Sequence, residues 1–316
     1  MKLFQCEHLT KTIGEFKLNN VSFSLEPGMI LGVIGMNGCG KTTLLRSILG
    51  SYRLDQNPED KGNIWLNLHN TSESNVHYRD NIKEYKQNIA YVLTECPFPG
   101  LMFAKEVGER YGRFYPGFDL HKYTQLLNDY EIPKKVLIRS LSAGQRIRMQ
   151  LAFALCYPAK LYVFDEPVGN LDVEFRDIFY EIVRELVSSG NCSVILSSHL
   201  VTELEHIADY LLWIEKKENV GNTIYFGSID DLKNSYRILN ATENAIQMIP
   251  KELLAGKRIR TNHSEFLLRT GAIDHSRNDQ SNGADLFESL PKELLSDLRY
   301  PDLQEIMYFT EKENLS

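Results

Sequence analysis

The chain has 316 residues, of which 43% are apolar and 24% charged, a composition typical of a globular protein of about two domains, which excludes a disordered or fibrous one. Its 35 basic and 42 acidic residues give a net charge of −7, so no nucleic-acid partner is expected. No apolar run approaches the roughly 18 residues that a membrane-spanning helix needs. Five scattered cysteines without a Cys-x-x-Cys pair indicate a reducing compartment and no structural zinc.

The chain begins with patterns that are typical of an α/β domain. Residues 18–25 largely alternate apolar and polar side chains, as a half-buried strand does, and residues 29–34 form a short apolar run between glycines. Such a run is typical of a strand buried on both faces, and a helix-like pattern follows it at residues 42–49. The order of strand, glycine loop and helix predicts the opening of an α/β domain.

Two segments with weaker periodicity follow. Residues 55–87 are polar with one strand-like run at 64–68, which predicts a peripheral lobe. Residues 98–118 are rich in aromatic residues, glycine and proline and lead into helical patterns up to Tyr130. We interpret this second segment as a contact-making subdomain, and the alternative is a local aromatic cluster that covers the chain's own helices.

The middle of the chain returns to regular patterns. Short apolar runs at residues 161–164 and 193–196 predict two buried strands, with a helix between them at 173–188. Strands that alternate with helices predict a mainly parallel sheet.

The composition changes after residue 228, so residues 229–316 are predicted to form a small C-terminal accessory domain without a motif of its own. Within it we expect strands at 236–247 and 257–268, a polar loop at 270–285 and an end helix at 302–310. Its role stays open between dimerisation, regulation and a cap on the edge of the first domain.

The strongest motif is the glycine loop GMNGCGKTT, which matches G-x-x-x-x-G-K-[ST] between a buried strand and a helix. Backbone N–H groups and the helix N-terminus form an anion site there, so the loop is predicted to bind the phosphates of ATP. Lys41 would reach the β and γ phosphates, and the Thr42 hydroxyl would bind magnesium. The predicted ATP-binding residues are Gly35, Asn37, Gly38, Cys39, Gly40, Lys41, Thr42 and Thr43.

A second candidate site lies where the apolar run LYVF ends in two carboxylates and a proline. Asp165 is expected to hold magnesium, and Glu166 to orient and deprotonate an attacking water. Alone, this pattern is equally typical of an ordinary strand end that leads into a proline turn.

With the segment SLSAGQRIRMQ the chain resembles the ATP-binding-cassette (ABC) ATPases. Their signature motif is matched by Leu141, Ser142, Ala143, Gly144 and Gln145, although a serine that caps a helix is the simpler explanation of this segment in isolation. Order and spacing favour the resemblance, because Ser142 lies 101 positions after Lys41 and a histidine, His199, lies 34 positions after Asp165.

The resemblance covers about residues 3–228 and implies an α/β P-loop NTPase of the ABC cassette type at 1–228, with a helical, permease-contacting subdomain at about 96–150. It implies that Asp172 belongs to the D-loop at the seam of a cassette dimer, and that His199 contacts the γ-phosphate. Lys41, Glu166 and His199 would then be catalytic. In this family ATP lies between the phosphate loop of one cassette and the signature of another, so a second cassette, identical or paralogous, is an expected partner.

The chain departs from the family pattern at two places. Thr94 stands where a glutamine is usual, and either its hydroxyl or neighbouring Glu95 would have to serve as the oxygen ligand of magnesium. Ile13 stands where an aromatic ring normally stacks on adenine, with Phe16 nearby. A third unusual residue is Cys39 in the phosphate loop, interpreted as a small filler, with a thiol activated by the helix N-terminus as the alternative.

The resemblance therefore implies a magnesium-dependent ATP hydrolase at the cytoplasmic face of the membrane, which powers a separate integral-membrane permease. The segment YPGFD at 115–119, the run SSHLVTELEHIADY and the accessory domain are most similar to bacterial drug, bacteriocin and peptide exporters, so export is expected. Two alternatives remain at this point: a soluble ABC ATPase that remodels ribosomes or DNA, and a regulatory cassette with little turnover.

Overall fold

The chain divides into two compact units in the computed structural model, which describes residues 1–55, 62–68, 75–241, 249–251, 253–259, 264–270, 294 and 297–313. One unit comprises Met1–His199 and Ile207–Phe226, and the other comprises Leu200–His206 and Gly227–Ser316. The division of the chain into functional domains after residue 228 stays a prediction.

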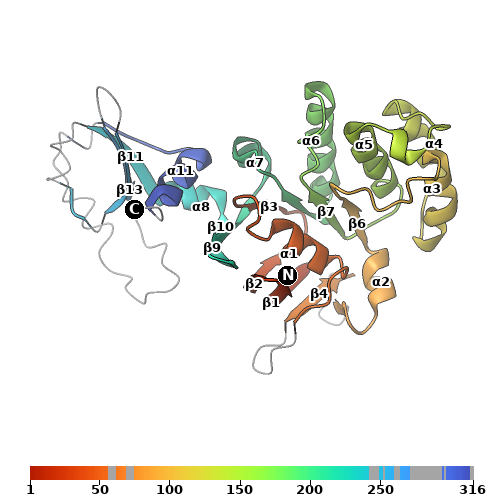
Figure 1. Ribbon diagram of the computed structural model, residues 1–316, viewed down its shortest axis with the longest axis horizontal. Helices are drawn as coiled ribbons and strands as arrows, with labels where there is room; N and C mark the ends of the chain where they lie inside the picture. The colour runs from red at the N-terminus through yellow and green to blue at the C-terminus, as the bar shows by residue number, and fades with distance from the viewer. Residues whose placement is uncertain are drawn as a thin grey trace. The chain divides into compact units, whose positions relative to one another are not determined.

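The first unit is built on a sheet of ten described strands in the order β5-β4-β1-β2-β10-β9-β3-β8-β7-β6 (Figure 1). Its strands are β1 (Phe4–Ile13), β2 (Phe16–Leu25), β3 (Ile30–Ile34), β4 (Asn63–Asn67), β5 (Asn75–His77), β6 (Ile89–Val92), β7 (Leu161–Asp165), β8 (Ser193–Ser197), β9 (Tyr210–Lys217) and β10 (Val220–Ser228). With its helices this sheet confirms the predicted α/β fold.

The sheet is mainly parallel, as expected, with an antiparallel part at one end. The pairs β6–β7, β7–β8, β8–β3, β3–β9 and β2–β10 are parallel. In contrast, β1 pairs antiparallel with β2 and with β4, and β4 pairs antiparallel with β5. β1 and β2 are antiparallel because they are joined by a two-residue hairpin, in which Gly14 has a φ of 58° and Ile13 pairs with Phe16. The predicted peripheral lobe therefore adds edge strands to the sheet.

The three strands that carry the site are buried on both faces. Every residue of β3, β7 and β8 is buried, which explains why each reads as a continuous apolar run in the sequence. The helices α1 (Lys41–Ile48) and α6 (Val173–Ser188) follow β3 and β7 along the chain. The strand ends from which Gly35, Glu166 and Ser198 continue therefore meet at one edge of the sheet.

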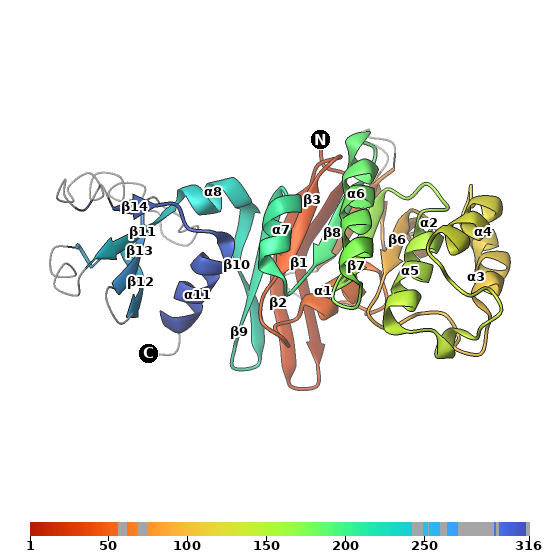
Figure 2. The ribbon, with the colours of Figure 1, turned by 90° about the horizontal axis from the view of Figure 1, so that it is seen from above.

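A helical region lies beyond β6 at one end of the sheet (Figure 2). It consists of α3 (Ala104–Tyr111), the 3-10 turn Gly112–Phe114, α4 (Leu120–Asp129), the 3-10 turn Ile138–Ser140 and α5 (Ala143–Ala154), and the short α2 (Ile82–Gln87) precedes β6. The rings of Phe98 and Phe118 lie 5.2 and 4.9 Å from the ring of Phe153 on α5. Some rings of the aromatic segment 98–118 thus pack against the chain's own helices, whereas Leu101, Phe103 and Phe114 stay exposed.

The second unit contains a four-stranded sheet in the order β12-β13-β11-β14. Its elements are α7 (Val201–Ile207), α8 (Ile229–Asn234), β11 (Tyr236–Ala241), β12 (Leu254–Ile259), β13 (Ser264–Arg269), β14 (Leu298–Arg299) and α11 (Leu303–Glu313). The single strand expected at 257–268 is wrong, because this stretch contributes to two antiparallel strands. Residues 242–247 of the other predicted strand and 271–285 of the predicted loop lie outside the described residues. In the described part of the chain, no helix is long and apolar enough to cross a bilayer.

Candidate active site

The phosphate loop turns sharply between β3 and α1 because its glycines adopt conformations that other residues resist. Gly35 has a φ of 144°, and a Cβ at this position would lie only 2.2 Å from the carbonyl oxygen of Ile214. Gly40 is the N-cap of α1, with a φ of 113°. The first N–H groups of α1 therefore point out of the loop without a side-chain cap, as in an anion-binding site.

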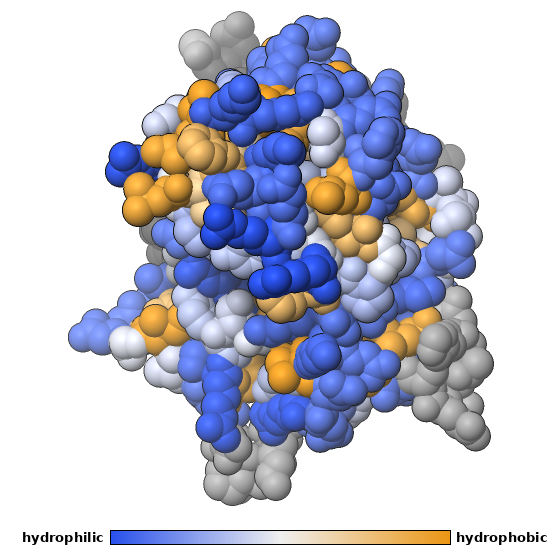
Figure 3. All heavy atoms as spheres, turned by 90° about the vertical axis from the view of Figure 1, so that its right-hand side faces the viewer, coloured by the Kyte–Doolittle hydropathy of each residue, from blue (hydrophilic) through white to orange (hydrophobic). Residues whose placement is uncertain are grey.

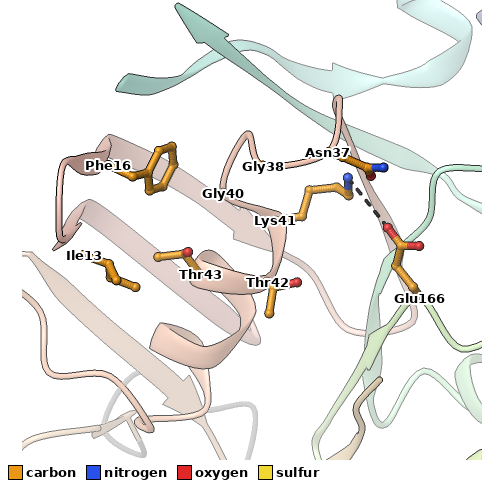
Figure 4. A pocket seen from close by; sticks show the side chains of 9 residues that line it. All are labelled: Ile13, Phe16, Asn37, Gly38, Gly40, Lys41, Thr42, Thr43 and Glu166. Atoms are coloured by element: carbon orange, nitrogen blue, oxygen red, sulfur yellow. Dashed lines mark ion pairs between the residues drawn. The ribbon is translucent and has the colours of Figure 1, made fainter. Parts of the chain in front are cut away.

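A cavity of about 360 Å³ lies against this loop, a size within the usual range for small-molecule sites (Figure 4). It is lined by Ile13, Phe16, Asn37, Gly38, Gly40, Lys41, Thr42, Thr43 and Glu166. Figure 4 shows the apolar side chains of Ile13 and Phe16 at one end and the charged side chains of Lys41 and Glu166 at the other. The cavity is thus polarised between an apolar end and a charged end.

Lys41 is held inside the loop, with only 6% of its side chain exposed. Its Nζ donates to the carbonyl oxygen of Gly35 at 2.7 Å and lies 3.7 Å from Oε1 of Glu166. A buried ammonium group needs such partners to offset the loss of its hydration. The structure therefore brings together the predicted phosphate-binding lysine and the predicted catalytic carboxylate.

Hard oxygen atoms converge at the end of β7. The Thr42 hydroxyl lies 3.3 Å from Oδ1 of Asp165, and the Ser197 hydroxyl donates to the same oxygen at 2.7 Å. Magnesium prefers a carboxylate together with other oxygen ligands, and Thr42 and Asp165 supply that kind of donor set. Sequence reasoning missed Ser197 as a site residue. The only signal for it was its place at the end of an apolar run, two positions before His199.

Glu166 is fixed between the strand ends of β7 and β8. Nδ1 of His199 lies 2.5 Å from Oε2 of Glu166. The Glu166 N–H donates to the backbone oxygen of Ser197 at 3.2 Å and to its hydroxyl at 3.1 Å. Its φ of 48° is a left-handed conformation that non-glycine residues seldom adopt and that is found preferentially at functional sites. The predicted catalytic residues Lys41, Glu166 and His199 thus form one contiguous cluster.

The two residues predicted as alternative magnesium ligands point to different places. The Thr94 hydroxyl donates to the backbone oxygen of Asp165 at 3.1 Å, so it contacts the main chain of the residue that carries the predicted magnesium carboxylate. The Glu95 side chain is 80% exposed, and its Oε2 lies 2.5 Å from Nη2 of Arg46 on α1. The structure therefore brings Thr94 to the site and directs Glu95 away from it.

The signature residues lie at the start of α5, and none of the described ones lines the cavity. The Ser142 side chain is the N-cap of α5 and accepts from the Gln145 N–H at 3.1 Å. Asp172 is the N-cap of α6 and pairs with Arg148 of α5. The Phe175 N–H, followed by the nearby Arg148, holds the pKa of the Asp172 carboxyl below its usual value. Both motifs therefore also have a structural role within the chain.

Cys39 is fully buried in the phosphate loop. Its burial raises the pKa of the thiol above the ordinary value, and this effect outweighs the opposite effect of Lys41. Burial and this direction favour the interpretation of Cys39 as a small filler over that of a thiol activated by the helix N-terminus.

Comparison with known proteins shows that the chain is similar to the ATP-binding proteins of ABC transporters. The family model described as "ABC transporter" matches residues 18–169. "ABC transporter ATP-binding protein YtrB" of Bacillus subtilis (strain 168) is 29% identical over 235 residues, which cover 74% of this chain and 75% of that protein. "Probable metal transport system ATP-binding protein" of Thermotoga maritima is 32% identical over 202 residues, which cover 63% of this chain and 75% of that protein.

A solved ATP-binding cassette, dimeric in a post-hydrolysis state with ADP and Pi, is similar in fold, with a TM-score of 0.58 and 18% identity over 71% of this chain and 98% of that one. Further relatives at 28% identity are named for linearmycin resistance in Bacillus subtilis and for Fe(3+) import in Pectobacterium atrosepticum, covering 73% and 67% of this chain. Their names differ in transport role.

Proposed function

Because the chain belongs to the ABC transporter family, we propose that it binds and hydrolyses ATP to drive a separate integral-membrane permease. The observation that carries this proposal is the cluster of Lys41, Glu166 and His199 at the charged end of the cavity. A cavity that only bound nucleotide would not need a carboxylate and an imidazole in contact beside the phosphate-binding lysine.

The residues of the cluster have distinct roles in this proposal. Lys41 and the N-terminus of α1 stabilise the negative charge on the β and γ phosphates. Thr42 and Asp165 would hold magnesium, which would neutralise part of that charge. Glu166 accepts a proton from the attacking water, and His199 fixes the carboxylate through its contact with Oε2.

The apolar end of the cavity binds the base. Phe16 and Ile13 line that end, and the Phe16 ring takes the place of the missing family aromatic. Nζ of Lys216 lies 5.8 Å from the centre of this ring, which adds a cation beside it.

The signature of α5 lies outside the cavity, so in this proposal it acts on the ATP of a second cassette. The second cassette is a copy of this chain or a paralogue. ATP would then join two cassettes, and hydrolysis would release them.

The permease binds at the helical region. Leu101 and Phe114 are 69% and 55% exposed, and Figure 3 shows this side of the molecule with apolar patches separated by hydrophilic surface. A groove of about 130 Å³ beside the region is lined in part by Tyr91, Leu93 and Tyr115. In this proposal the chain lies at the cytoplasmic face of the membrane, where it contacts the permease through this surface. Export is proposed from the likeness of residues 115–119 to bacterial exporters.

The test compares purified wild-type protein with Glu166→Gln protein by light scattering and phosphate release. We expect the variant to dimerise with ATP and magnesium and to stay monomeric with ADP, while wild-type turnover per chain rises with protein concentration. Full turnover at a dilution where the protein is monomeric would contradict the two-cassette site.

A further inference from the structure

Gln150 is a buried polar side chain on α5 that has no role in the proposed binding and hydrolysis of ATP. Only 1% of the residue is exposed. Its Oε1 accepts from the Leu93 N–H at 3.0 Å, and its Nε2 donates to the Leu93 carbonyl oxygen at 3.0 Å. Nε2 also lies 3.3 Å from the carbonyl oxygen of Arg146, one turn earlier on α5. One amide thus pairs with both backbone groups of a single residue.

This pairing takes the place of a neighbouring strand. β6 ends at Val92, so the backbone groups of Leu93 lie beyond the ladder that β6 forms with β7. Buried backbone groups need partners, and a side-chain amide offers an acceptor oxygen beside an NH2 donor, as the backbone of a neighbouring strand offers a C=O and an N–H. An apolar side chain at this position would leave the N–H and the C=O of Leu93 without these partners.

The loop that begins at Leu93 leads directly to the site. Its next residue, Thr94, donates to the backbone oxygen of Asp165, and Glu95 pairs with Arg46 on α1. Residues 93–95 are therefore attached to three elements, namely α5, β7 and α1. α5 carries the signature, β7 the magnesium carboxylate, and α1 the phosphate loop.

We propose that Gln150 is a positioning residue that transmits the position of α5 to Thr94 and to the carboxylate end of β7. Two hydrogen bonds to the N–H and the C=O of Leu93 fix both the position and the orientation of its backbone relative to α5, whereas apolar packing would let the loop slide along the helix. A displacement of the signature helix then moves the loop beside the metal site. This inference rests on the proposed function, since it assumes that ATP and magnesium bind at the cavity.

The test replaces Gln150 with methionine, which has a similar volume and removes both hydrogen bonds. We expect kcat to fall about tenfold and the half-saturating magnesium concentration to rise several-fold, while KM for ATP stays within about twofold. The matched control is Met149→Ala, a change at the adjacent buried residue of the same helix. It should lower the melting temperature without changing kcat or the magnesium dependence of the folded protein. The proposal would be overturned if Gln150→Met, like the control, lowered the melting temperature and left kcat and the magnesium dependence unchanged.

A second variant tests whether Gln150 acts through the loop. If it does, adding Gln150→Met to Thr94→Val should change kcat by less than about twofold, because the position of the Thr94 hydroxyl no longer matters. Fully additive losses would overturn the proposal.

A structural readout separates this proposal from the proposed function. Hydrogen exchange of a peptide that covers residues 92–96 should be faster in Gln150→Met than in Met149→Ala. Magnesium should also increase the affinity for a fluorescent ATP analogue less in Gln150→Met than in Met149→Ala. A wild-type protein that binds and hydrolyses no ATP would refute the proposed function, and the exchange rates would still decide whether Gln150 holds the loop. Equal exchange in the two variants would refute the role of Gln150.

Discussion

Replacing Glu166 with glutamine should separate ATP binding from ATP hydrolysis, since it removes one charge with little change in shape. Glu166 loses the ability to take a proton from water, and a positioned general base contributes about 10²–10⁴-fold to a rate. We therefore expect kcat to fall about 10³-fold, which corresponds to ~4 kcal/mol in the activation free energy.

The same substitution should tighten ATP binding. The Glu166 carboxylate lies 3.7 Å from Nζ of Lys41, so it competes with phosphate for that ammonium group. At this distance the attraction is about 1 kcal/mol in water and about 4.5 kcal/mol at an effective dielectric constant of ~20. Because phosphate replaces the carboxylate as the partner of Lys41, we use the smaller of these two energies. We therefore predict that the Kd for ATP is about five- to tenfold lower in the variant.

Phosphate release measures kcat, and equilibrium binding of ATP with magnesium measures Kd. The control is Glu185→Gln, the same chemical change at an exposed position of α6, which should leave both constants within about twofold of wild type. A Glu166→Gln protein that keeps kcat within threefold of wild type would refute the role of this carboxylate. A weakened Kd would refute its competition for Lys41.

Three further outcomes follow from the site. Ser197→Ala removes a 2.7 Å hydrogen bond to buried Asp165, so chemical denaturation should show a loss of about 1.5–3 kcal/mol in the free energy of unfolding; an unchanged value would contradict this contact. Burial raises the pKa of both the Cys39 and the Cys96 thiol, but only Cys96 is partly exposed, so alkylation at pH 7.5 followed by mass spectrometry should modify Cys96 before Cys39. Early modification of Cys39 would refute its burial. Phe16→Ala should weaken ATP binding about tenfold and triphosphate binding much less, and equal losses for both ligands would place the base elsewhere.

The parts of the site that the sequence predicted well are those in which chain neighbours determine the geometry. The buried run before Gly35 and the helix after it were predicted to within one residue, because a glycine loop between an apolar strand and a helix leaves few alternatives. The helix at 173–188 was predicted without error, because the apolar side chains Phe175, Phe179 and Val183 recur on one face of α6.

Contacts between distant segments could not be predicted in this way. Gln150 is polar within an amphipathic helix, a pattern that predicts an exposed position, yet it is buried against a backbone 57 positions away. The sequence could not show whether Phe16 compensates for Ile13. Only the pairing of Ile13 with Phe16 in the structure brings both residues to the cavity. β1 was missed because shifts in its register near Leu9 interrupt the alternation of its side chains.

The measurement that tests the central claim most directly is an affinity purification of the Glu166→Gln protein from detergent-solubilised native membranes with ATP and magnesium, with wild-type protein and ADP as the control. We predict recovery of a polytopic membrane protein with the variant in ATP, together with a second cassette that is either the same chain or a paralogue. Recovery of only ribosomal or DNA-associated proteins, with no membrane protein, would contradict the role of this chain as the ATPase of a transporter.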